Sequence, residues 1–208
     1  MSKLSHFKNI IFDLGGVVLN LNYSLTVQAF KKFIPDLDED FFLGKEKQLK
    51  FFSDYEIGLI STQEFKKQFE KHYSIHLTDE DFQYCWNAMI LNFPLGRVEL
   101  IRKLRDEGKQ IFLLSNINDL HERKVDEKFA ELNLPYQLKD LFHQVYYSHK
   151  ISLRKPHTEI FSFVLEQNKL SSSDTLFVDD SFQHIVGAKK LGLETIHLKQ
   201  PLLIEDFF

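Results

Sequence analysis

Three short apolar runs in this sequence each end in polar residues, and this pattern constrains the fold more than any other feature. The run IIFD ends at Asp13, IFLLSN ends at Ser115 and Asn116, and TLFVDD ends at Asp179 and Asp180. Continuous apolar runs of this length are typical of strands buried on both faces of a parallel sheet. Because parallel strands bring their carboxyl ends to one edge, we expect these polar residues to converge there.

Helical patterns fill the segments around these runs, so helices and strands alternate along the second half of the chain. The segment VELIRKLRDEG precedes IFLLSN, and EIFSFVLEQN precedes TLFVDD. The segments QVYYS and ETIHL have the character of further short strands. This alternation is typical of a parallel sheet with helices packed on both faces. The sequence therefore predicts an α/β fold with a Rossmann-like parallel sheet core.

The stretch before Pro94 differs, because its apolar residues follow helical spacing without strand-like alternation. A chain of 208 residues is long enough for one α/β core with one appendage. We therefore expect a core of residues 1–18 and 94–208 and an inserted all-helical subdomain of residues 19–93. The Phe-rich segment 39–52 is assigned to the interior of that subdomain in preference to a dimer surface.

Charge and cysteine content narrow the classes of function. The formal net charge is −4, with the charges spread along the chain, and this balance indicates neither nucleic acid nor a membrane as a partner. Cys85 is the single cysteine, so an intramolecular disulfide is excluded. No apolar stretch approaches the ~20 residues of a membrane span, and the first apolar run reads as a strand and not as a signal peptide. We expect a cytoplasmic protein, and the sequence does not indicate its oligomeric state.

Four polar segments follow one another in a characteristic order. They are IIFDLGGVV, LLSNIND, RKPHTEIF and FVDDSFQHIVGAKKLG. In order and spacing they resemble the four signature motifs of the haloacid dehalogenase superfamily, and the resemblance covers nearly the whole chain, including a helical cap after the first strand. The Asp-Leu-Gly of the first motif is most similar to small sugar-phosphate phosphatases. The resemblance implies a phosphoric monoester hydrolase with a small phosphorylated substrate, a sugar phosphate being favoured.

The same resemblance implies a role for several of the polar side chains. Asp13 would attack the phosphate and form an aspartyl-phosphate, which water then hydrolyses. Ser115 and the amide of Asn116 would hold phosphoryl oxygens. Lys155 would act as a point charge that pairs with Asp13 and with the phosphate.

A divalent cation is expected beside these groups, because a phosphate dianion repels a carboxylate nucleophile. Adjacent carboxylates supply the hard oxygen ligands that Mg²⁺ prefers. The implied magnesium site consists of the carboxylates of Asp13, Asp179 and Asp180 and the backbone carbonyl of Gly15.

The first motif departs from the superfamily pattern at Gly15, where related phosphatases usually carry a second Asp that protonates the leaving oxygen. Acid–base assistance of this kind contributes typically about 10²- to 10⁴-fold to the rate. Glu56, a metal-ordered water or a leaving group that needs little protonation could compensate for its loss. We therefore expect Gly15→Asp to raise activity toward alkyl phosphates. Tyr55 and Glu56 are candidates for substrate selection.

Two other functions fit parts of the pattern. A catalytically weak binding or regulatory protein could use the same cleft to hold a phosphorylated metabolite, and would bind ligand with magnesium without releasing phosphate. A 2-haloacid dehalogenase would also use Asp13 as the nucleophile and would tolerate Gly15, but would need no cation. The adjacent Asp179 and Asp180 favour phosphoryl transfer over dehalogenation.

Overall fold

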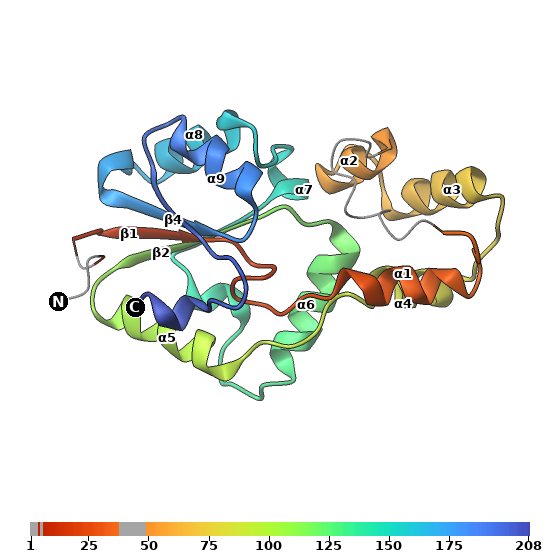
Figure 1. Cartoon of the computed structure of the whole chain (residues 1–208), viewed down its shortest axis with the longest axis horizontal. Helices are drawn as coiled ribbons and strands as arrows, with labels where there is room; N and C mark the ends of the chain where they lie inside the picture. The colour runs from red at the N-terminus through yellow and green to blue at the C-terminus, as the bar shows by residue number, and fades with distance from the viewer. Residues whose placement is uncertain (1–3, 5, 38–48) are drawn as a thin grey trace.

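The computed structural model shows a sheet with helices on both faces and a group of helices that extends from one end of it (Figure 1). This arrangement confirms the predicted α/β fold with a parallel core and a helical insert. No helix in the described part of the chain is long and apolar enough to cross a membrane. The residues described are 4, 6–37 and 49–208.

The sheet is parallel, and its five strands are arranged in the order β3-β2-β1-β4-β5. β1 lies at the centre and pairs with both β2 and β4, so all three carboxyl ends point to the same edge. The strands are β1 (Asn9–Phe12), β2 (Gln110–Ser115), β3 (Gln144–Tyr147), β4 (Thr175–Asp179) and β5 (Glu194–His197).

Helices cover both faces of the sheet because its central strands are apolar on both sides. Ile10 and Phe12 of β1 pack into one hydrophobic cluster, and Ile11 packs into the cluster on the opposite face. In Figure 1, α5 (Leu95–Asp106) and α6 (Asp119–Ala130) lie below the sheet, and α8 (Thr158–Gln167) and α9 (Phe182–Lys189) lie above it. Shorter helices are α7 (Ser148–Ile151), η2 (Leu138–Leu141), η3 (Ser172–Asp174) and η4 (Ile204–Asp206).

The insert contains four described helices, and three of them begin at a capping side chain. These helices are α1 (Tyr23–Lys31), α2 (Lys50–Glu56), α3 (Thr62–Tyr73) and α4 (Asp79–Asn87). The side chains of Asn22, Ser61 and Thr78 accept hydrogen bonds from backbone amides in the first turns of α1, α3 and α4.

Aromatic side chains form a separate hydrophobic core inside the insert. Phe65 stacks on Tyr55, with ring centroids 4.3 Å apart, and lies 4.7 Å from Trp86. Of the Phe-rich segment predicted to lie inside the insert, Phe52 is buried in this core, and residues 39–48 lie outside the described part of the chain. The insert therefore has a hydrophobic core of its own, which Leu120 of α6 extends at the contact with the α/β core.

Candidate active site

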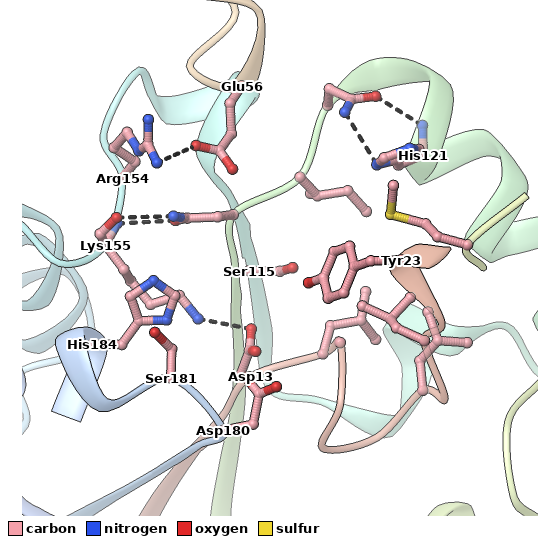
Figure 2. A pocket seen from close by; sticks show the side chains of 18 of the residues that line it. Asp13, Tyr23, Glu56, Ser115, His121, Arg154, Lys155, Asp180, Ser181 and His184 are labelled. Carbon is pink, nitrogen blue, oxygen red and sulfur yellow. Dashed lines mark hydrogen bonds and ion pairs between the residues drawn. The ribbon is translucent and has the colours of Figure 1, made fainter. Parts of the chain in front are cut away.

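A cavity of about 720 Å³ opens where the carboxyl ends of the central strands meet the helical insert. Both parts of the molecule contribute side chains to its wall, as Figure 2 shows. The core contributes Asp13, Gly15, Ser115, Asn116, Lys155 and Asp180, and the insert contributes Tyr23, Glu56, Trp86 and Met89. Six of the seven site residues predicted from the sequence thus line one cavity, and Asp179 lies beneath it.

Lys155 is the central cation of this site, and its side chain is fully buried. Its ammonium group donates hydrogen bonds of 2.7 Å to Asp13 Oδ1, 2.7 Å to Asp179 Oδ2 and 2.9 Å to the carbonyl oxygen of Leu114. An ammonium group has three protons, so all of its donors are used. A buried charge is tolerated only when it is compensated in this way.

The charges of this cluster shift one another's pKa values. Burial raises the pKa of Asp13 to about 7; the charge of Lys155 opposes this shift, and Asp179 and Asp180 add to it. Burial also acts to raise the pKa of Asp179, but Lys155 and a hydrogen bond from His184 outweigh it and hold that pKa at about 2. For Lys155, burial acts to lower the pKa, and the two carboxylates more than offset it, so its pKa is raised. Lys155 therefore stays charged, whereas its charge does not fully offset the effect of burial on the pKa of Asp13.

Asn116 positions the lysine through the backbone. Its side-chain amide donates to the carbonyl oxygen of Lys155 and accepts from the Lys155 amide, both at 2.9 Å. Ser115 is buried at the end of β2, and Figure 2 shows its hydroxyl between Asp13 and Tyr23. The two residues predicted to bind phosphate thus lie side by side, Ser115 on the cavity and Asn116 anchoring the Lys155 loop.

The three predicted aspartates form a group whose oxygens could hold a metal ion. One carboxylate oxygen from each of Asp13, Asp179 and Asp180 lies within 4.8 Å of the others. Asp180 is exposed to the cavity, whereas both oxygens of Asp179 already accept hydrogen bonds, including one of 2.7 Å from the Ser181 amide. Gly16 has a φ of +75°, and a Cβ atom there would lie 2.5 Å from Asp180 Oδ2, so glycine is required at this turn.

Magnesium fits this donor set on chemical grounds. The three ligands are carboxylates, which Mg²⁺ prefers, and one buried lysine compensates part of their charge. A divalent cation among them would lower the pKa of Asp13, which burial and the neighbouring carboxylates raise, because a positive charge favours the carboxylate form.

A hydrogen-bond network that sequence reasoning did not select joins the insert to the core beside the cavity. Asn118 Oδ1 accepts from Trp86 Nε1 at 3.3 Å and from the His121 amide at 3.0 Å, so its NH₂ group faces His121 Nδ1. His121 Nε2 then donates to the Trp86 carbonyl at 3.0 Å, and burial lowers the pKa of His121 to about 4. His121 is therefore a neutral structural link.

The two neighbours proposed for substrate selection have different surroundings. Tyr55 is buried in the insert, its hydroxyl 2.9 Å from the Thr62 hydroxyl, and it does not line the main cavity. Glu56 does line the cavity, and its carboxylate pairs with Arg154 of the core at 2.8 Å (Figure 2). Glu56 thus lies on the cavity, and its role in substrate selection stays a prediction, whereas Tyr55 lies outside the cavity wall.

The sequence matches the family model of the haloacid dehalogenase-like hydrolases over residues 10–198. A D-ribitol-5-phosphate phosphatase from Bacteroides thetaiotaomicron is 34% identical over 189 residues, which are 90% of this chain and 90% of that protein. A sesquiterpene phosphatase from Aspergillus oryzae is 25% identical over 198 residues, or 94% of this chain and 92% of that protein.

Solved structures agree with the sequence matches. A haloacid dehalogenase family enzyme from B. thetaiotaomicron, in complex with magnesium and inorganic phosphate, is 31% identical with a TM-score of 0.82, covering 97% of this chain and 99% of that one. A predicted hydrolase of the same family from Porphyromonas gingivalis is 26% identical with a TM-score of 0.81, covering 95% and 94%. The family model covers most of the chain, and the strand ends carry the expected polar groups, so this protein belongs to the haloacid dehalogenase-like hydrolases.

Proposed function

We propose that this hydrolase is a magnesium-dependent phosphatase of a small sugar or polyol phosphate and that it works through an aspartyl-phosphate on Asp13. The observation that carries the proposal is the buried Lys155, held 2.7 Å from both Asp13 and Asp179 beneath an open cavity. A dephosphorylating relative at 34% identity supports the same class of reaction.

The residues of the core carry out the phosphoryl transfer. Asp13 attacks phosphorus, and Lys155 keeps its carboxylate oriented and offsets the charge that gathers on the phosphate. The Ser115 hydroxyl and the backbone amide of Asn116 bind phosphoryl oxygens at the end of β2, while the Asn116 side chain holds the Lys155 loop. Water then hydrolyses the aspartyl-phosphate and returns Asp13 to its carboxylate form.

Mg²⁺ is the cofactor, and Asp13, Asp180, the Gly15 carbonyl and Asp179 are its proposed ligands. When bound, the ion neutralises the repulsion between the phosphate dianion and the Asp13 carboxylate. Residues 19–93 are the proposed cap, which covers the cavity and limits the entry of water during transfer.

The wall of the cavity favours a hydroxylated substrate. The ion pair of Glu56 with Arg154 can accept hydrogen bonds from hydroxyl groups and donate to them, whereas Trp86, Met89 and Ile90 give the cavity an apolar lining as well. A purely apolar alkyl phosphate would leave the charged pair without polar contacts and would cover it from water. A sugar or polyol phosphate offers hydroxyl groups to the charged pair and carbon atoms to the apolar lining.

Phosphate release from a panel of substrates tests the proposal. The panel includes a polyol phosphate, a hexose phosphate, a long-chain alkyl phosphate and p-nitrophenyl phosphate, each with Mg²⁺ or with EDTA. We expect the hydroxylated substrates to have the highest kcat/KM and EDTA to remove activity that added Mg²⁺ restores. Absence of phosphate release, with magnesium-dependent binding of phosphate alone, would favour a binding protein, and halide release from a 2-haloacid in EDTA would favour a dehalogenase.

The expected gain from Gly15→Asp depends on Leu21. A Cβ atom at Gly15 would overlap Leu21 Cδ1, so the leucine side chain occupies the space that an aspartate would need. We expect Gly15→Asp combined with Leu21→Ala to exceed Gly15→Asp alone by at least about tenfold in kcat for alkyl phosphates. Leu21→Ala alone is the control, and equal activity of the single and double variants would contradict this explanation.

A further inference from the structure

The leaving oxygen needs a hydrogen-bond donor on the side of the cavity opposite Asp13. Attack on phosphorus is in line, so a substrate phosphate beside Asp13 at the end of β1 directs its leaving group toward the helical insert. Lys155 cannot serve, because its three protons are already donated within the core. A donor on the wall formed by the insert would lie on the side toward which the leaving group departs.

Tyr23, the first residue of α1, lies at this position. It lines the cavity, and Figure 2 shows its hydroxyl pointing toward Ser115 and Asp13. The two residues before it are held against the segment that follows α4: Leu21 bridges to Ile90, and the Asn22 amide donates to the Met89 carbonyl at 2.9 Å.

The other side-chain donors that the described part of the insert presents to the cavity are already engaged. The Ser53 hydroxyl donates to the Lys50 carbonyl at 2.7 Å, and Trp86 Nε1 donates to Asn118. The Tyr23 hydroxyl, by contrast, has no hydrogen-bond partner among the described residues. It is therefore available to a substrate.

We propose that the Tyr23 hydroxyl donates a hydrogen bond to the leaving oxygen and is a catalytic residue of this enzyme, an inference that rests on the proposed phosphatase function. In the first step the bond from Asp13 to phosphorus forms and the bond from phosphorus to the leaving oxygen breaks. The leaving oxygen keeps the electron pair, is stabilised by Tyr23 and takes its proton from water. Across both steps one water is consumed, its hydrogen going to the leaving oxygen and its hydroxyl to phosphorus.

The chemistry of the side chain agrees with a donor role. A tyrosine hydroxyl has an ordinary pKa of about 10 and is protonated at pH 7. Tyr23 is partly exposed, at 43%, but its hydroxyl faces the cavity, where reduced solvation raises its pKa further, as do the nearby carboxylates of Asp180, Asp13, Glu56 and Asp179. A neutral hydroxyl among carboxylates can stabilise negative charge on the leaving oxygen without adding charge of its own.

The proposed role of Tyr23 is consistent with the absence of an acidic side chain at Gly15. Leu21 Cδ1 fills the space next to Gly15, so an acidic side chain there would have to displace the leucine. Two residues later, Tyr23 supplies a polar group to the same cavity from the insert. In the proposed reaction, Tyr23 thus provides a neutral donor from the insert where Gly15 provides no acidic side chain.

The test compares Tyr23→Phe with wild type on two kinds of substrate. With a polyol or other alkyl phosphate, whose leaving oxygen is strongly basic, we expect kcat to fall about 10- to 100-fold. With p-nitrophenyl phosphate, whose leaving oxygen is weakly basic, we expect a fall of less than about threefold. The plot of log kcat against leaving-group pKa should therefore be steeper for the variant.

Tyr84→Phe is the matched control, because Tyr84 lies on α4, is 63% exposed and does not line the cavity. We expect wild-type kcat from it with both substrates. Equal losses with both substrates, or no loss with either, in Tyr23→Phe would overturn the role of Tyr23 while leaving the phosphatase intact. No phosphate release by wild type would instead overturn the proposed function, and this inference with it.

Discussion

Asp13→Asn is expected to reduce magnesium-dependent phosphate release by about 10⁴-fold or more. An amide cannot form the aspartyl-phosphate, because it lacks the nucleophilic oxygen that the carboxylate supplies. The substitution keeps the shape of the side chain and leaves an oxygen that can accept from Lys155, so the fold and the 2.7 Å contact should be preserved. Steady-state phosphate release with saturating Mg²⁺ measures the loss.

Asp106→Asn provides the control for this experiment, because the Asp106 side chain is 71% exposed on α5, away from the cavity. Its activity should equal that of wild type. Thermal unfolding of Asp13→Asn should occur at or above the wild-type temperature, because one of three neighbouring carboxylates has been neutralised. Retention of more than a few per cent of wild-type activity would show that Asp13 is not the nucleophile.

The polar residues at the strand ends could be predicted from the sequence, because a short apolar run followed by a polar residue identifies each of them locally. Asp13, Ser115 and Asp179 each follow or end an apolar run, and a parallel sheet with β1 between β2 and β4 necessarily gathers them at one edge. Lys155 was identified only through resemblance to a family. It lies in a loop, and no periodicity predicts that its side chain turns inward to meet two carboxylates.

The wall formed by the insert could not be predicted, because it depends on how helices pack far apart in sequence. Tyr55 and Glu56 are neighbours on α2, yet the first faces the aromatic core of the insert and the second faces the cavity. The relation of Leu21 to Gly15 likewise depends on the bridge between Leu21 and Ile90, which are distant in the chain. Which residue of a helix points toward a ligand is set by such packing and not by spacing alone.

The network of Trp86, Asn118 and His121 illustrates the same limit. Each of these residues has an ordinary role in isolation: an aromatic core residue, a helix cap and a surface histidine. Only when α4 packs beside α6 do they satisfy one another, with the indole and imidazole rings 5.1 Å apart. No local pattern predicts this contact, because Trp86 lies 32 residues from Asn118 and 35 residues from His121 in the chain.

Lys155→Met is expected to lower the free energy of unfolding by about 3–5 kcal/mol as well as to abolish activity. Removing the ammonium group leaves the buried carboxylates of Asp13 and Asp179 facing each other without a counter-ion, which is a costly arrangement in a low-dielectric interior. Methionine preserves most of the volume, so the loss arises from charge and not from a large cavity. Denaturant unfolding in EDTA measures the change directly.

Two comparisons separate this electrostatic explanation from a general loss of packing. Lys8→Met removes an exposed lysine that pairs with Asp174 at 2.7 Å on the surface, and it should cost less than about 1 kcal/mol. Adding Asp179→Asn to Lys155→Met should recover part of the lost stability, because it removes one of the two uncompensated charges. If the double variant were no more stable than Lys155→Met, the lysine would be acting through its packing, and the charge balance argued for this site would be wrong.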